Sequence, residues 1–210
     1  MTFVKICGIT SIEDALLAVD AGADALGLNF VTSSKRVIDR VTAAHIADAV
    51  GDVVELIAVV ADRSEDFLDD LRETTGIRWL QLHGSEAPSA LQGLLPEAFK
   101  AVAIGTAADV VRAREYGGTR LLVDAKPASG ELGGTGERFD WSLVASLSTE
   151  RDLIVAGGLR PDNVGDAIDA LAPFGVDVAS GVETTGNARK KDESKLRAFV
   201  AAVRARERSA

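Results

Sequence analysis

The sequence contains very little cysteine: Cys7 is the only one in 210 residues. A single cysteine cannot form a disulfide within the chain, which excludes the small secreted folds that disulfides hold together. The N-terminal residues also lack a basic segment followed by an apolar run, the usual pattern of a secretory signal. We therefore expect a cytoplasmic protein.

The chain also lacks an excess of positive charge and lacks long apolar runs. Its formal net charge is -9, which disfavours nucleic acid and anionic lipid as partners. No apolar stretch approaches the roughly 20 residues that a membrane-spanning helix needs. The two histidines and one cysteine form no cluster with zinc-ligand spacing, so we expect no metal. These absences leave a small molecule as the expected partner.

Short apolar segments alternate with amphipathic stretches along the whole chain, and 47% of the residues are hydrophobic. This pattern predicts parallel strands joined by helices around one large core. Eight such units, with no marked switch point, favour a closed (β/α)8 TIM barrel over an open doubly wound sheet. We expect a single domain over residues 1–210, with strands at residues 3–7, 24–28, 53–60, 77–82, 99–104, 119–125, 152–156 and 176–179.

Two of the expected helix starts carry recognisable signals. Thr10 with Glu13 fits a capping box, and Pro161 suits the first position of a helix. The longest segments without periodicity, residues 29–40 and 126–138, are expected to be functional loops. Within the second loop, the glycine-rich residues 130–138 match neither common nucleotide-binding glycine pattern, and we interpret them as a mobile cover.

Two reactive side chains lie at the ends of predicted strands. Active sites of (β/α)8 barrels form at the C-terminal ends of the strands. Cys7 closes the first expected strand, and Asp124 closes the sixth. Only strands seven and eight separate them on the short way round, so they could approach a ligand from opposite sides as base and acid. Taken alone, Cys7 is also consistent with a small buried hydrophobe, and Asp124 with a carboxylate that caps a turn.

Lys5 shares the inward face of the first strand with Cys7. A buried ammonium needs a counter-charge because burying it unpaired is costly. Asp177, on the eighth strand and therefore next to the first in a closed barrel, can supply that charge. His83 closes the fourth strand, and we interpret it as a structural or wall residue rather than a catalyst.

Small residues follow the seventh and eighth strands: Gly157 and Gly158 in one loop, Ser180 and Gly181 in the other. Either pair alone is typical of a tight turn. Together, at these two strands, they predict a phosphate site built from backbone N–H groups. Arg36, in the loop after the second strand, suits a planar carboxylate through its bidentate fork, although an ordinary exposed arginine is also consistent with its position.

Six ordered blocks resemble the phosphoribosylanthranilate isomerases of tryptophan biosynthesis: KICGIT, GLNF with SKR, LQLHGSE, LLVDAK with GGTGERFDW, AGGLRPDNV, and DVASGVE with KKD. The resemblance implies a cofactor-independent aldose–ketose isomerase, an intramolecular oxidoreductase. Its substrate, a phosphorylated aminosugar, would be N-(5-phosphoribosyl)anthranilate, and its product 1-(2-carboxyphenylamino)-1-deoxyribulose 5-phosphate. The resemblance further implies Cys7 as general base, Asp124 as general acid, Arg36 as the anthranilate contact and the two glycine loops as the phosphate site.

One block departs from the family pattern. AVVAD, residues 58–62, ends the third strand where the family has a phenylalanine and an asparagine, so the resemblance supplies no aromatic wall there. Two other functions remain open from the residues alone. One is a phosphosugar epimerase or lyase on the same barrel, and the other is a catalytically silent phosphate-binding subunit. The sequence predicts no particular oligomeric state.

Overall fold

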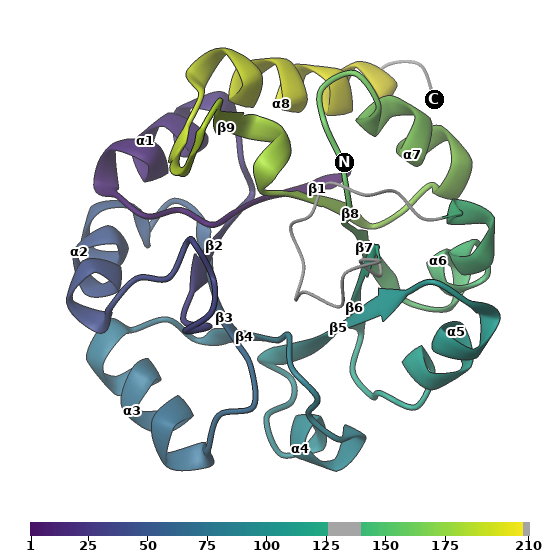
Figure 1. Ribbon diagram of the computed structural model, residues 1–210, viewed down its shortest axis with the longest axis horizontal. Coiled ribbons are helices and arrows are strands. Elements are labelled where there is room, and N and C mark those ends of the chain that lie inside the picture. Colours follow the sequence, from purple (N-terminus) through teal and green to yellow (C-terminus); the bar gives the residue numbers. More distant parts are fainter. Residues whose placement is uncertain (126–139, 208–210) are drawn as a thin grey trace.

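Eight parallel strands close into a barrel in chain order (Figure 1). The computed structural model describes residues 1–125 and 140–207, so the predicted cover at residues 130–138 lies outside the described residues. The prediction of a (β/α)8 barrel is confirmed. The strands are β1 (Phe3–Cys7), β2 (Ala25–Asn29), β3 (Glu55–Val60), β4 (Trp79–Leu82), β5 (Ala98–Ile104), β6 (Arg120–Ala125), β7 (Asp152–Val155) and β8 (Gly175–Val178).

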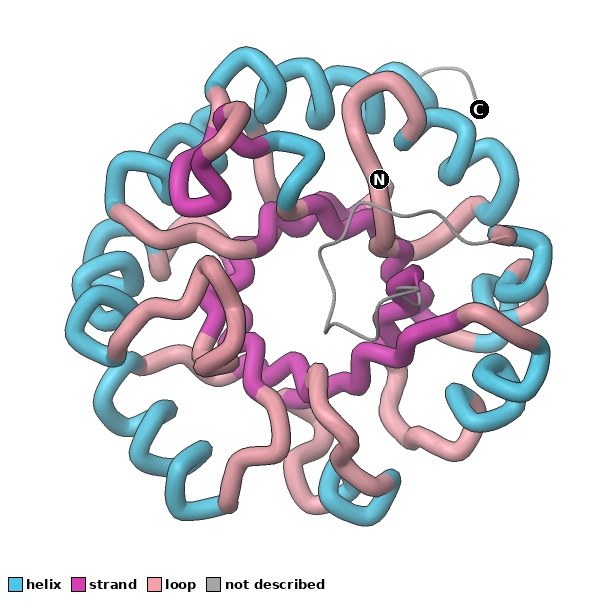
Figure 2. Tube along the Cα trace, viewed as in Figure 1, coloured by secondary structure: helices cyan, strands magenta, loops and turns pink. Residues whose placement is uncertain are grey.

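Helices form a ring around the outside of the barrel (Figure 2). They are α1 (Ile12–Ala21), α2 (Arg40–Val50), α3 (Glu65–Thr75), α4 (Pro88–Gln92), α5 (Ala107–Ala113), α6 (Leu147–Glu150), α7 (Val164–Leu171) and α8 (Glu193–Glu207). Two short 3₁₀ helices, η1 (Trp141–Val144) and η2 (Ser180–Val182), follow β6 and β8 respectively. In the part of the chain that the structure describes, no helix combines the length and apolar character needed to span a membrane.

Two helix starts differ from the sequence predictions. Ser11, not Thr10, is the N-cap of α1, and its hydroxyl accepts a hydrogen bond from the backbone N–H of Asp14. Helix α7 begins at Val164 rather than at Pro161. Both predictions were wrong because residue type does not reveal which of several suitable residues adopts the backbone angles of a cap.

A small antiparallel hairpin lies at the rim of the barrel, between η2 and α8 (Figure 1). Its strands are β9 (Glu183–Thr184) and β10 (Asn187–Lys191). The sequence analysis did not predict it, because β10 reads NARKK and has no apolar alternation. Lys191, the last residue of β10, is nevertheless buried.

The core has two main layers, as expected for strands whose alternate residues face the barrel axis and the helices. Most buried apolar side chains lie between the strands and the helices. A smaller cluster fills the barrel itself, formed by Ala25, Ile57, Phe99, Ala101, Leu122, Ile154 and Ala156. Nearer the C-terminal ends of the strands, Cys7 packs with Val31 and Val59 in a third cluster. Apolar side chains thus fill the barrel interior, and the reactive side chains lie at its mouth, at the C-terminal ends of the strands.

Candidate active site

Cys7 and Lys5 face into the barrel from β1, as the strand pattern predicts. The register of β1 and β8 aligns Lys5 with Asp177, and the ammonium donates a hydrogen bond to the carboxylate at 2.9 Å. Lys5 is completely buried, so this ion pair provides the counter-charge that the buried ammonium needs. The predicted pairing of Lys5 with Asp177 is confirmed.

Gly27 on β2 makes room for the thiol and the ammonium. A Cβ atom at this position would lie 2.7 Å from Cys7 Sγ and 2.9 Å from Lys5 Nζ. Any side chain at position 27 would therefore force one of the two groups to move. The sequence analysis missed Gly27, because a glycine within a strand carries no sign of which neighbour needs the space.

Asp124 lies near the end of β6, only 8% exposed. Burial, and after it the negative charge of Asp177, raise the pKa of Asp124 to about 7. Gly157 passes directly against this carboxylate: its φ is 88°, and a Cβ there would lie 3.0 Å from Asp124 Oδ1. Glycine at 157 is thus required both by the left-handed backbone and by the close approach to the acid.

The Lys5–Asp177 pair acts on Cys7 and Asp124 in opposite directions. Burial raises the pKa of Cys7, and the positive charge of Lys5 opposes this more strongly than Asp177 adds to it. For Asp124 the order is reversed, since Asp177 raises its pKa more than Lys5 lowers it. The ammonium end therefore favours the thiolate form of Cys7, and the carboxylate end favours the neutral acid form of Asp124.

Arg36 lies over the start of the loop that follows β1. Its Nε and Nη2 atoms donate to the two carboxylate oxygens of Glu183 at 2.5 and 3.0 Å. Its aliphatic part packs on Gly8, where φ is 75° and a Cβ would overlap Arg36 Cδ. One edge of the guanidinium is therefore occupied by a carboxylate of the protein, which the sequence analysis did not predict. The structure shows no bond from the Nη1 side to the described residues.

The loops after β7 and β8 contact each other closely. A Cβ on Gly181 would overlap the carbonyl oxygen of Leu159. In the first loop, Asn163 Nδ2 donates to the Gly158 carbonyl at 2.9 Å, and Asn163 Oδ1 accepts from the backbone N–H of Arg160 at 2.7 Å. The structure thus brings together the two segments in which the sequence predicts a phosphate site.

His83 is half-buried and contacts Gln81, with 3.0 Å between His83 Nδ1 and Gln81 Nε2. Burial, followed by the positive charges of Lys100 and Lys5, lowers the pKa of His83 to about 4. Its imidazole is therefore neutral near neutral pH. Lys100 Nζ fixes the loop after β4 through the carbonyls of Leu82 and Gly84, at 3.1 and 2.7 Å.

The residues at the end of β3 divide between two layers of the core. Val60 packs in the layer between strands and helices, whereas Val59 and Ala61 pack near Cys7. Asp62 has a φ of 51°, a conformation that asparagine and aspartate tolerate better than most residues.

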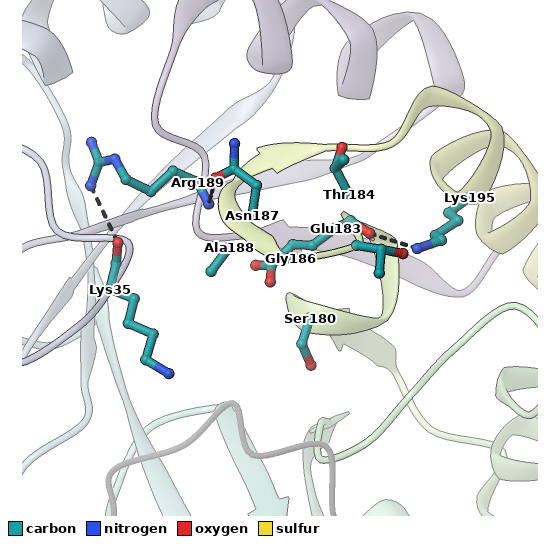
Figure 3. Close-up of a pocket in the computed structure, with 10 residues that line it drawn as sticks. Lys35, Ser180, Glu183, Thr184, Gly186, Asn187, Ala188, Arg189 and Lys195 are labelled. Atoms are coloured by element: carbon teal, nitrogen blue, oxygen red, sulfur yellow. Dashed lines mark hydrogen bonds between the residues drawn. The ribbon is translucent and has the colours of Figure 1, made fainter.

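A cavity of about 650 Å³ lies beside the mouth, between the loop after β2 and the β9–β10 hairpin (Figure 3). Lys35, Ser180, Glu183 and Arg189 are among its lining residues, and neither Cys7 nor Asp124 is. Within residues 1–125 and 140–207 there is no group of three or more His, Cys, Asp and Glu side chains arranged to hold a metal.

The sequence pattern of the N-(5'-phosphoribosyl)anthranilate (PRA) isomerases matches residues 4–202. The chain belongs to this family. The isomerase is 42% identical over 202 residues to N-(5'-phosphoribosyl)anthranilate isomerase of Geobacter sp. (strain M21), covering 96% of this chain and 97% of the relative. It is 43% identical over 206 residues to the enzyme of Myxococcus xanthus (strain DK1622), covering 96% and 95%.

Solved structures of PRA isomerases have the same fold as this isomerase. The structure from Thermotoga maritima has a TM-score of 0.87 and 35% identity, covering 98% of this chain and 100% of that one. A second, with a TM-score of 0.85, 34% identity and the same coverage, is a complex with reduced 1-(o-carboxyphenylamino)-1-deoxyribulose 5-phosphate. The resemblance and the isomerase function predicted from the sequence are confirmed.

Proposed function

We propose that this isomerase converts N-(5-phosphoribosyl)anthranilate to 1-(2-carboxyphenylamino)-1-deoxyribulose 5-phosphate with Cys7 as general base and Asp124 as general acid. The observation that carries the proposal is the buried Lys5–Asp177 pair, whose two ends favour a thiolate and a neutral carboxyl group. The reaction needs both forms at once, which reverses the order in which the free groups ionise.

Each group has one task in the first half of the reaction. Asp124 donates its proton to the furanose ring oxygen, the bond from that oxygen to C1 breaks, and the nitrogen lone pair forms the Schiff base. The Cys7 thiolate then removes the C2 proton, which gives the enolamine. Cys7 then returns its proton to C1, and the C2 hydroxyl proton passes to the Asp124 carboxylate. These two transfers convert the enolamine to the ketone and restore both groups of the enzyme.

The raised pKa of Asp124 makes the required ionisation state accessible. With reference pKa values of about 3.9 and 8.5, only about one molecule in forty thousand would hold the thiolate and the neutral acid together. A pKa of about 7 for Asp124 removes most of that penalty. Since burial raises the pKa of Cys7 as well, the gain depends on Asp124.

The remaining predicted residues bind the two ends of the substrate. The free side of Arg36 would hold the anthranilate carboxylate, and backbone N–H groups at Gly157, Gly158, Ser180 and Gly181 would hold the phosphate. Lys5, Asp177 and His83 would support the site from the barrel strands and the loop after β4. This chemistry uses no cofactor and no nucleic acid, and we propose that it takes place in the cytoplasm.

Turnover of the aminoribosyl substrate, followed through the fluorescence of its anthranilate group, tests the function directly. We expect wild-type protein to consume the substrate and Cys7→Ser protein to bind it without turnover. A wild-type protein that binds the reduced product analogue but consumes no substrate would instead be a silent binding subunit. Epimerisation or cleavage of a simple sugar phosphate would indicate another enzyme of the same fold.

A further inference from the structure

The β9–β10 hairpin holds the Arg36 loop by its backbone as well as by its side chain. Arg189 Nη1 donates to the carbonyls of Lys35 and Val37, the residues on either side of Arg36, at 3.3 and 2.8 Å. Figure 3 shows Arg189 reaching from the hairpin to Lys35 across the edge of the cavity. Because Glu183, at the start of the hairpin, binds the Arg36 guanidinium, the loop is fixed at three successive residues.

Lys191, at the end of the hairpin, connects this anchor to the strand that carries Cys7. Its buried ammonium donates to the Cys7 carbonyl at 2.7 Å, to the Ala179 carbonyl at 3.2 Å and to Glu183 Oε1 at 3.3 Å. One side chain therefore joins the ends of β1 and β8 to the carboxylate that holds Arg36. A shift of the hairpin would move Arg36 relative to Cys7.

The charges of this cluster suit an anionic ligand. Glu183 alone would neutralise Arg36 and remove most of its attraction for a carboxylate. Lys191 adds a second positive charge on the same carboxylate, so the three groups, two cations and one anion, keep one net positive charge. Because these groups are buried, water screens their charge poorly, so the charge acts more strongly on a nearby ligand.

We propose that the β9–β10 hairpin positions Arg36 for the ring carboxylate of the substrate, with Glu183, Lys191 and Arg189 as positioning residues. The inference rests on the proposed role of Arg36. It assigns to the segment between η2 and α8 a part in substrate selection: these residues do not touch the reacting atoms, but they decide where the carboxylate of the substrate can bind.

The test measures discrimination for the carboxylate. The probes are reduced 1-(o-carboxyphenylamino)-1-deoxyribulose 5-phosphate and its counterpart without the ring carboxylate, and the readout is the ratio of their dissociation constants. In wild type we expect a ratio of about ten or more, as befits a charge-assisted fork. Glu183→Gln removes the carboxylate that aligns the guanidinium and also a negative charge that opposes the ligand; since Lys191 already offsets that charge, the lost alignment should dominate and reduce the ratio about threefold. Arg189→Met removes an exposed side chain and should fold, and it should reduce the ratio about threefold.

Lys100→Met is the matched control. Lys100 is a second buried lysine that binds two backbone carbonyls and a glutamate, Glu86, but it does so at the loop after β4. Both Lys191→Met and Lys100→Met should lose stability, but only Lys191→Met should reduce the ratio. An unchanged ratio in both Arg189→Met and Glu183→Gln would overturn the role of the hairpin. A wild-type protein that does not discriminate at all would instead overturn the role of Arg36 itself.

Discussion

The two ends of the barrel each hold a cation beside a carboxylate, but the surroundings of the two pairs differ. At the N-terminal end, Arg120 binds both oxygens of Glu55, at 2.5 and 3.3 Å. Three aromatic rings surround its guanidinium, with centroids at 4.0 Å for Trp79, 5.1 Å for Phe3 and 5.7 Å for Phe174. The three rings carry no ionisable group, so the pair serves the fold rather than a reactive neighbour.

At the C-terminal end, the Lys5–Asp177 pair faces a thiol and a carboxyl group in place of rings. Its field therefore changes the protonation of its neighbours, as the raised pKa of Asp124 and the opposing effect of Lys5 on Cys7 indicate. An ion pair surrounded by groups that cannot titrate contributes stability. An ion pair beside groups that can titrate also changes their protonation, and so contributes to reactivity.

The largest effect on activity is expected from Cys7→Ser. A hydroxyl is far less acidic than a thiol, so Lys5 cannot make it a useful base, and turnover should fall by about a thousandfold or more. Steady-state kinetics measure the loss, and titration with the reduced product analogue should give a dissociation constant close to that of wild type. Wild-type turnover in this variant would mean that Cys7 is only core packing.

Asp124→Asn keeps the shape of the side chain but removes the proton that it transfers. Turnover should fall by about a hundredfold or more. The double variant with Cys7→Ser should be little worse than the poorer single variant, since the two groups serve one reaction sequence. Losses that multiply in full would contradict the paired roles of Cys7 and Asp124.

The pH profile separates the two groups further. In the dependence of kcat/KM on pH, the limb on the acid side should arise because Cys7 must lose its proton, and the limb on the alkaline side because Asp124, with a pKa of about 7, must keep its proton. Asp124→Asn should abolish the alkaline limb and leave the acid limb, which then rises through the pKa of Cys7. Retention of both limbs in this variant would assign the alkaline limb to another group.

Asp124→Asn should also show how the raised pKa of Asp124 changes the free energy of unfolding with pH. The pKa of Asp124 is about 7 in the folded protein against 3.8 for the free group, so the folded state binds the proton more tightly. The stability that this proton contributes is complete below about pH 4 and is lost as the pH rises to about 7. Relative to Asp124→Asn, the wild-type free energy of unfolding should therefore fall across that window, by on the order of a few kcal/mol. Denaturant titrations at several pH values measure the difference.

Arg120→Met should affect activity least. Loss of the ion pair and of the cation–ring contacts should lower the free energy of unfolding by about 1–3 kcal/mol. Since the cage lies at the far end of the barrel, kcat and KM measured well below the melting temperature should stay within about twofold of wild type. A large change in kcat would show that the two ends are coupled and would weaken the comparison.

The sequence by itself determined the barrel and the main reactive residues. Eight alternations of apolar strands with amphipathic helices, with no switch point, favour a closed parallel sheet, and the C-terminal ends of its strands bring Cys7 and Asp124 to one rim. The pairing of Lys5 with Asp177 was also predictable, because adjacent strands have a simple register and a buried charge needs a partner. These features depend on local periodicity and on neighbouring strands.

Only the tertiary structure decided how the reactive residues are supported. Gly27 leaves space for the thiol and ammonium, Glu183 occupies one edge of Arg36, and Lys191 joins the hairpin to β1. The aromatic cage around Arg120 likewise gathers side chains from β1, β4 and the residue before β8. Each of these contacts joins residues that are far apart in the chain. They depend on how side chains of particular shapes pack together, which the periodicity of the sequence does not predict.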